Sequence, residues 1–86
     1  MGNMAERQQA ALLAELADLI KVSELGSVRA VATAIDMDYY TFRRWLKGEQ
    51  EMRLGTMLRA LEVIDVPFSE LLSRAELRVE RGTETD

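Results

Sequence analysis

The residues best equipped for chemistry lie in a run of ten, from Tyr39 to Gly48, with the sequence YYTFRRWLKG. This run contains basic residues and tyrosines but no acid, although the whole chain carries a net charge of -4. Guanidinium and ammonium groups bind phosphate, and one arginine can donate two hydrogen bonds to a guanine edge. The residue types therefore predict a surface that contacts DNA, or alternatively charges that only solvate a helix.

The spacing within this run predicts a short amphipathic helix. Phe42, Trp45 and Leu46 recur at the i, i+3, i+4 spacing that faces a core, while the tyrosines and basic residues cover the remaining surface. Asp38 is placed to cap the first free amides, and Gly48 is placed to end the helix in the left-handed conformation. We expect Phe42 and Trp45 to hold this helix on the core.

The preceding segments must position this helix, and they also have helical periodicity. A long helix is predicted over residues 5–25, ended by Gly26, and Ser27 is expected to cap a short helix over residues 28–35. Residues 36–38 then form a three-residue turn, with Met37 as its apolar plug. The apolar stripe of the long helix consists of Leu12, Leu13, Leu16, Leu19 and Ile20.

Two more helices are predicted after the polar loop 49–51. One runs to about Ile64, with Leu54, Met57, Leu58 and Leu61 facing inward. The other begins at Pro67, ends at Gly82 and carries the apolar residues Phe68, Leu71, Leu72, Ala75, Leu77 and Val79. No segment alternates like a strand, so the prediction is an all-α, compact five-helix bundle over residues 5–81, with flexible ends at 1–4 and 82–86.

The composition argues against several other functions. The chain has no cysteine and no histidine, which excludes disulfides, thiol chemistry, zinc sites of the Cys/His kind and an imidazole base. No glycine-rich phosphate loop and no metal-ligand spacing is present. We therefore expect no catalytic residues, no metal and no cofactor. No apolar run approaches the roughly 20 residues that span a bilayer, so we expect a cytoplasmic protein without a membrane partner.

Two short helices joined by a three-residue turn have the layout of a helix-turn-helix. The stretch from Val31 to Gly48 resembles the Cro and phage-repressor (XRE) family of helix-turn-helix proteins, as do the downstream Leu54, Leu58, Leu61 and the pair Leu71-Leu72. The resemblance covers about residues 12–75. It implies a bundle of the lambda-repressor type, in which the helix at residues 39–47 enters the major groove of DNA.

The resemblance also implies roles for individual residues. Base contacts are expected from Tyr39, Tyr40, Arg43 and Arg44, and phosphate contacts from Ser27, Arg43, Lys47 and Arg53. Arg44 is the strongest candidate for a specific contact, since two hydrogen bonds to guanine discriminate by about 1–3 kcal/mol. A tyrosine offers one hydroxyl and a ring, so it specifies less sharply. The alternative for the two tyrosines is a surface aromatic pair that packs on a neighbouring helix or on a protein.

The chain differs from the family pattern at three places. Asp36 stands where a turn glycine is usual, and aspartate visits the left-handed region more easily than most residues. Val28 stands where a side-chain amide usually contacts phosphate. The loop Glu49-Gln50-Glu51 is acidic where the family is commonly basic, so it repels phosphate, and Arg53 compensates in part.

These observations together predict a transcriptional regulator, by default a repressor, that acts as a homodimer on a palindromic operator. Two half-sites roughly 34 Å apart supply the affinity that one small domain lacks. The expected dimerisation residues are Leu72, Ala75, Leu77 and Val79. Two alternatives remain: an antitoxin or another protein-binding adaptor built on the same helices, with a toxin as its partner, and a purely structural bundle without salt-dependent DNA binding.

Overall fold

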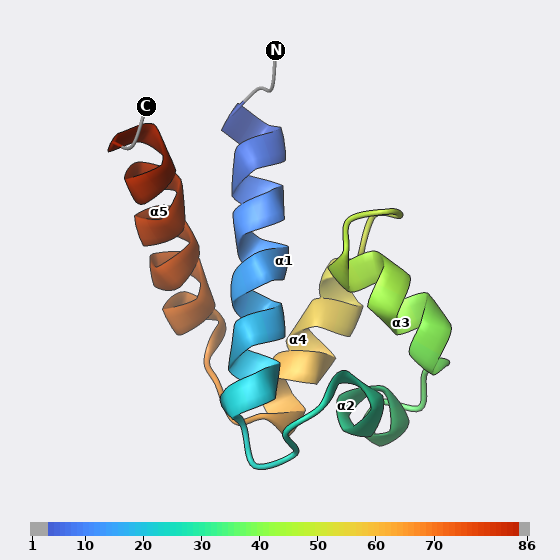
Figure 1. Ribbon diagram of the computed structural model, residues 1–86. Coiled ribbons are helices and arrows are strands. Elements are labelled where there is room, and N and C mark those ends of the chain that lie inside the picture. Colours follow the sequence, from blue (N-terminus) through green and yellow to red (C-terminus); the bar gives the residue numbers. More distant parts are fainter. Residues whose placement is uncertain (1–3, 85–86) are drawn as a thin grey trace.

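The computed structural model describes residues 4–84, which form five α-helices (Figure 1). The helices are α1 (Met4–Val22), α2 (Val28–Ala34), α3 (Tyr39–Leu46), α4 (Leu54–Val63) and α5 (Phe68–Glu84). No strand occurs within residues 4–84, so the predicted all-α class is confirmed. Met4 is helical rather than part of a flexible end, whereas residues 1–3 and 85–86 lie outside the described residues.

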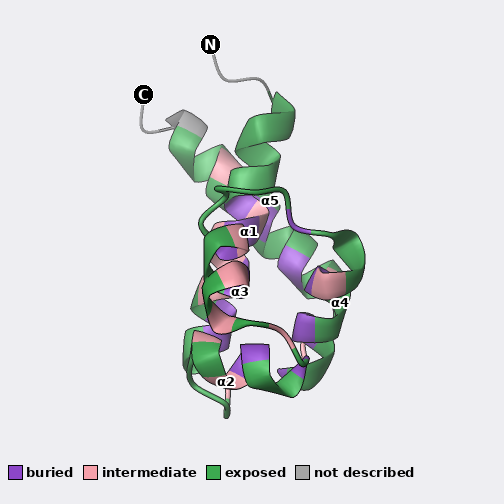
Figure 2. Cartoon of the chain, turned by 90° about the vertical axis from the view of Figure 1, so that its right-hand side faces the viewer, coloured by how far each residue is buried: buried purple, intermediate pink, exposed green. Residues whose placement is uncertain are grey.

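The helices are arranged as a long pair and a short pair with α4 between them. The long helices α1 and α5 lie side by side and antiparallel, while α2 and α3 lie to one side of them (Figure 1). In Figure 2, buried residues gather where α1 to α4 converge, and the ends of α1 and α5 nearest the termini are mostly exposed. The short pair is therefore anchored on one half of the long pair.

One continuous apolar core joins all five helices. Its largest fully buried side chains are Phe42, Leu16, Ile20, Leu61, Leu71 and Val31. Because these side chains come from every helix, none of the helices can leave the core without opening a cavity. The described chain is thus a single domain.

Two helices end in the same left-handed turn. Asp36 follows α2 and Asp65 follows α4, and both have a φ of 58°. After α2, the Met37 amide donates to the Ala32 carbonyl at 2.8 Å, and the Val66 amide makes the equivalent bond after α4 at 3.0 Å. Asp36 therefore takes the conformation expected from glycine, and the turn between α2 and α3 closes without one.

The first helix ends earlier than its apolar pattern predicted. It stops at Val22 rather than near Leu25. The hydroxyl of Ser23 donates to the Ile20 carbonyl at 2.7 Å, and the Gly26 amide donates to the Ser23 hydroxyl at 3.3 Å. The Ser23 side chain thus makes hydrogen bonds with nearby backbone groups that compete with those of a further helical turn.

The last helix runs further than predicted. It passes through Gly82 to Glu84, so Gly82 does not end it, and residues 82–84 are not a separate tail. Glycine ends a helix where it adopts a positive φ, and Gly82 is not among the positive-φ residues of the described chain. The presence of a glycine at position 82 was therefore not sufficient to predict the end of α5.

The prediction for α4 was half wrong. Met57 and Leu61 are buried, but Leu54 is 59% exposed and Leu58 is 42% exposed. Met57, Ala60 and Leu61 lie on the face of α4 that packs against the core. The apolar stripe of α4 is therefore wider than the part of its surface that the other helices cover.

An arginine of the last helix ties the long pair together. Arg78 of α5 donates to Glu15 at 2.5 Å and to Asp18 at 2.8 Å, both on α1. Arg74 pairs along α5 with Glu70 at 3.2 Å. Both arginines are therefore ion-paired within the chain.

Candidate nucleic-acid interface

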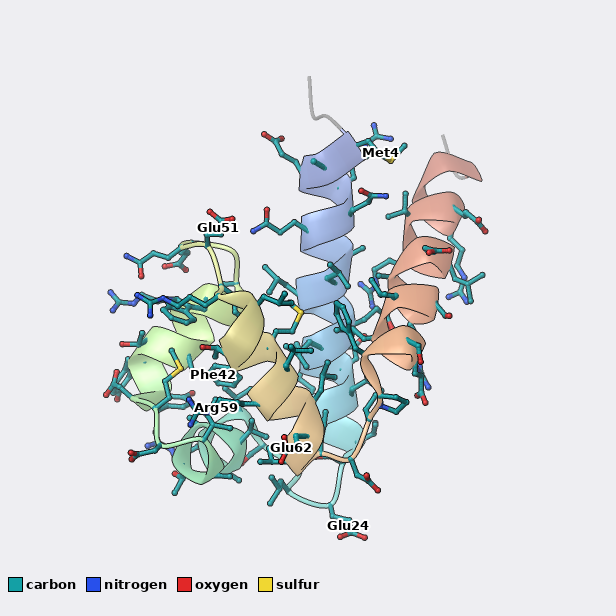
Figure 3. All side chains as sticks on the ribbon, turned by 180° about the vertical axis from the view of Figure 1, so that it is seen from behind. Met4, Glu24, Phe42, Glu51, Arg59 and Glu62 are labelled. Carbon is teal, nitrogen blue, oxygen red and sulfur yellow. The ribbon has the colours of Figure 1, made fainter. Side chains whose placement is uncertain are left out.

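The inner face of α3 fixes this helix on the domain. Phe42 is 0% exposed and Leu46 is 9% exposed, and Figure 3 shows Phe42 pointing from α3 toward α4. Trp45 is partly buried rather than fully so, since it packs at the edge of the core. Its Nε1 donates to the Gln50 Oε1 at 3.1 Å, which ties the following loop to α3.

The outer face of α3 brings four of the predicted site residues together. Tyr40, Arg43, Arg44 and Lys47 lie at the i, i+3, i+4, i+7 spacing of one helix face, and all four are exposed. They line a shallow hollow of about 360 Å³, with Glu49 at its edge. We call these four residues the α3 stripe.

The α3 stripe carries positive charge that no neighbouring acid neutralises by contact. Among the described side chains, those of residues 4–82, no carboxylate lies within ion-pair distance of Arg43, Arg44 or Lys47. Glu49 is nearby, and its amide donates to the Arg44 carbonyl at 3.1 Å in the turn that ends the helix. The stripe is thus a positive surface on an acidic chain, bordered by one glutamate.

Both ends of α3 are built as predicted. Asp38 accepts from the amide and the hydroxyl of Thr41, at 3.0 and 3.1 Å. These hydrogen bonds lower the pKa of the Asp38 carboxyl below its ordinary value, and the charge of Arg44 adds to the effect. At the other end Gly48 has a φ of 80°. The helix therefore begins and ends through its own local sequence.

Tyr39 lies apart from the α3 stripe. Its ring is partly buried against the core, and the Arg29 guanidinium lies 4.1 Å from the ring centroid. The Tyr40 ring meets it edge-on, with centroids 5.1 Å apart, while Tyr40 itself is 62% exposed. The two tyrosine rings thus contact each other, and only Tyr40 faces outward. The sequence did not predict this contact between Arg29 and Tyr39, because no residue spacing shows that α2 lies beside the start of α3.

The two remaining phosphate candidates are separate from the hollow. Ser27 caps α2, since its hydroxyl oxygen accepts from the Ala30 amide at 3.1 Å. Arg53 is exposed at the start of α4, and its side chain makes no capping bond there. Neither residue lines the hollow at the α3 stripe. Their predicted contacts stay predictions.

The four expected dimerisation residues do not form one seam. Leu72, Ala75 and Val79 line a groove of about 330 Å³ beside Leu12 of α1. Ala75 is only 5% exposed, so it forms the floor of the groove rather than a projecting contact. Leu77 is 49% exposed but lies roughly 200° around α5 from Val79, at 3.6 residues per turn. Leu77 is therefore on a different face from the other three.

Metal sites and membrane spans are features that the described chain does not show. Among the described side chains of residues 4–82, no three from His, Cys, Asp or Glu gather so that they could hold a metal ion. No helix there combines the length and the apolarity needed to cross a bilayer. No family model, curated protein or solved structure matches this chain.

Proposed function

We propose that this protein is a sequence-specific DNA-binding regulator of the helix-turn-helix type that inserts α3 into the major groove and represses transcription as a homodimer. The observation that carries the proposal is the α3 stripe, in which three exposed cations without carboxylate partners and one exposed tyrosine lie on a helix whose opposite face is buried. The major groove of B-DNA is wide enough to admit one α-helix. A helix anchored in this way can present its outer face to base edges.

The length of the α3 stripe sets how much sequence one copy can read. The stripe spans two helical turns, about 10 Å at 1.5 Å per residue, which corresponds to about three base pairs. Arg44 and Arg43 are suited to guanine, Tyr40 to a thymine methyl group, and Lys47 to a phosphate. Three base pairs are too few to specify an operator, so the proposal requires a second copy.

The groove between α1 and α5 is the surface we propose for that second copy. Leu72 is 39% exposed beside Leu12 and Val79, and the polar residues Gln8, Glu76 and Glu80 line the same groove. Interfaces combine apolar residues at the centre with polar residues around them. Two copies joined in this way would present their α3 helices to two half-sites.

The negative net charge favours selectivity over general DNA coating. The chain carries -4 overall, and Glu49 borders the α3 stripe. Contacts to phosphate supply most of the non-specific affinity, so an acidic body weakens binding to random sequence. Specific base contacts must then supply a larger share of the binding energy.

Selection of random duplex DNA tests the proposal directly. The wild-type protein should enrich a palindromic motif near physiological salt, and Arg44→Ala should lose the preference for one base pair per half-site, worth about 1–3 kcal/mol. Arg74→Ala is the matched control, because Arg74 is an exposed arginine whose partner is Glu70 on α5. An absence of enrichment by the wild-type protein at low and at moderate salt would contradict the proposal.

A protein-binding adaptor, such as the antitoxin of a toxin pair, is the second candidate. It is favoured by a separate surface beside the loop after α1, where Val22 is 81% exposed, Leu25 38% and Val63 37%. These side chains line one hollow with the acids Glu24 and Asp65. Val22→Asp should then abolish binding of the partner protein, as measured by native mass spectrometry of the complex purified from its own host. The same variant should select the same DNA sequence as the wild type.

A further inference from the structure

Arg29 and Tyr39 form a contact between the first turns of α2 and α3. The guanidinium carbon of Arg29 lies 4.1 Å from the centroid of the Tyr39 ring. No carboxylate among the side chains of residues 4–82 pairs with Arg29. A ring face attracts a cation without neutralising its charge and leaves its N–H donors free to bind something else. Arg29 therefore keeps its full charge and its hydrogen-bonding capacity.

Tyr39 is held in place on two sides. It packs against the core from the first turn of α3, and Tyr40 meets its ring edge-on at an interplanar angle of 69°. A ring held in this way restricts the guanidinium stacked on it. Because a long side chain normally loses rotamer freedom on binding, an arginine that is ordered beforehand binds at a smaller entropic cost. The tyrosine thus has a role that does not require its hydroxyl.

We propose that Arg29 is a DNA phosphate-binding residue of the interface, and that Tyr39 is its positioning residue rather than a reader of bases. This inference rests on the proposed DNA binding through α3. Arg29 is exposed on α2 next to the helix that enters the groove. A cation beside the groove-reading helix meets the sugar-phosphate backbone rather than base edges, so its contribution does not depend on sequence.

A phosphate contact and a base contact differ in how their loss changes the salt dependence and the sequence preference of DNA binding. Loss of one phosphate contact weakens binding to all sequences alike and lowers the slope of log K against log salt by about 0.9. Loss of a base contact changes the preferred sequence and leaves this slope nearly unchanged. A purely structural link between α2 and α3 would lower the melting temperature without changing the slope.

The test measures affinity for the selected operator and for a scrambled duplex over a salt series. Arg29→Ala should lose about tenfold in affinity for both duplexes and about 0.9 in slope per copy, with its melting temperature unchanged. Tyr39→Leu should show the same losses, and the conservative variant Tyr39→Phe should restore affinity and slope because it keeps the ring. The double variant Arg29→Ala/Tyr39→Leu should be no weaker than Arg29→Ala alone. Lys21→Ala is the control for an exposed charge outside the α2–α3 pair.

The outcomes separate this inference from the proposed function. If the wild-type protein binds no duplex with salt dependence, the proposed function fails. If it binds and Arg29→Ala keeps the full affinity and slope, the inference alone is overturned. A change of preferred sequence in Tyr39→Phe would likewise overturn it, since Tyr39 would then read a base through its hydroxyl.

Discussion

The arginines of α3 and those of α5 are the same side chain in two opposite situations. Arg43 and Arg44 have no carboxylate within ion-pair distance among the side chains of residues 4–82, whereas Arg78 binds both Glu15 and Asp18 of α1. In α5 the charge is used inside the chain, to hold two helices together. In α3 the charge has no such partner among the described side chains, and we propose that it binds DNA.

The difference arises from the acidic side chains that lie near the arginines of each helix. The long helix α1 presents two acids one turn apart, Glu15 and Asp18, to Arg78 of α5. The acid closest to the start of α3 is Asp38, and its oxygen is engaged by the amide and hydroxyl of Thr41. A charged side chain therefore acquires a structural or a binding role from its neighbours, and its type alone does not decide between the two.

The largest expected effect is a difference in the free energy of unfolding between substitutions on the two faces of α3. Phe42→Ala should cost about 3–5 kcal/mol in the free energy of unfolding, because it removes a fully buried ring from the core. Arg43→Ala, one position along on the outer face, should change that free energy by less than about 0.5 kcal/mol. Urea denaturation followed by circular dichroism measures both. Equal losses in the two variants would mean that α3 has no free outer face.

A second effect tests the arginines directly. Arg78→Ala should cost about 1 kcal/mol in the free energy of unfolding, since its side chain is 43% exposed and solvent screens the two ion pairs. Arg44→Ala should cost nothing measurable in stability, and its effect should appear in DNA binding instead. The cost of Arg78→Ala should shrink in 1 M salt. A larger loss of stability in Arg44→Ala than in Arg78→Ala would reverse the comparison.

A third, smaller effect concerns the acid at the edge of the α3 stripe. Glu49→Gln should raise the affinity for DNA about threefold, or about 0.6 kcal/mol, the energy of one charge several ångströms from a phosphate in water. The gain should be similar for specific and non-specific duplexes. Glu76→Gln on α5 serves as the control for a loss of charge elsewhere. Unchanged affinity in Glu49→Gln at low salt would place the DNA away from this hollow.

The smallest effect is the pH dependence of the α3 cap. The pKa of Asp38 is lowered in the folded chain by its hydrogen bonds from Thr41. Between the folded value and the unfolded value of 3.8 the unfolded state binds more protons, so stability rises with pH. The contribution is complete above the unfolded value and is lost as the pH falls through the folded one. Denaturation between pH 2 and 5 should show a shallower acid slope for Asp38→Asn than for the wild type.

Much of this architecture follows from short-range chemistry, and α3 is the clearest case. Its first residue, its Asp38 cap and its left-handed end at Gly48 all agree with the prediction. Asp36 also adopts the left-handed conformation expected of its position. These features depend on residues within about five positions of one another, so the local sequence contains the information needed to predict them.

The errors share one cause. Leu54 and Leu58 were assigned to the core, Tyr39 was assigned to the outer face of α3, and Leu77 was grouped with Val79. In each case helical periodicity identified an apolar or polar face but not which partner covers it. The extent of burial depends on the surface that other helices offer, and that surface comes from residues distant in the chain.

The local sequence therefore sets where the helices lie, how most of them begin and end, and which residue types face outward on α3. The tertiary structure alone decides that α1 supplies carboxylates to Arg78 and that Arg29 stacks on Tyr39. Helix formation and capping are governed by hydrogen bonds over a few residues. The pairing of charges and rings across helices depends on distances that only the packed core establishes.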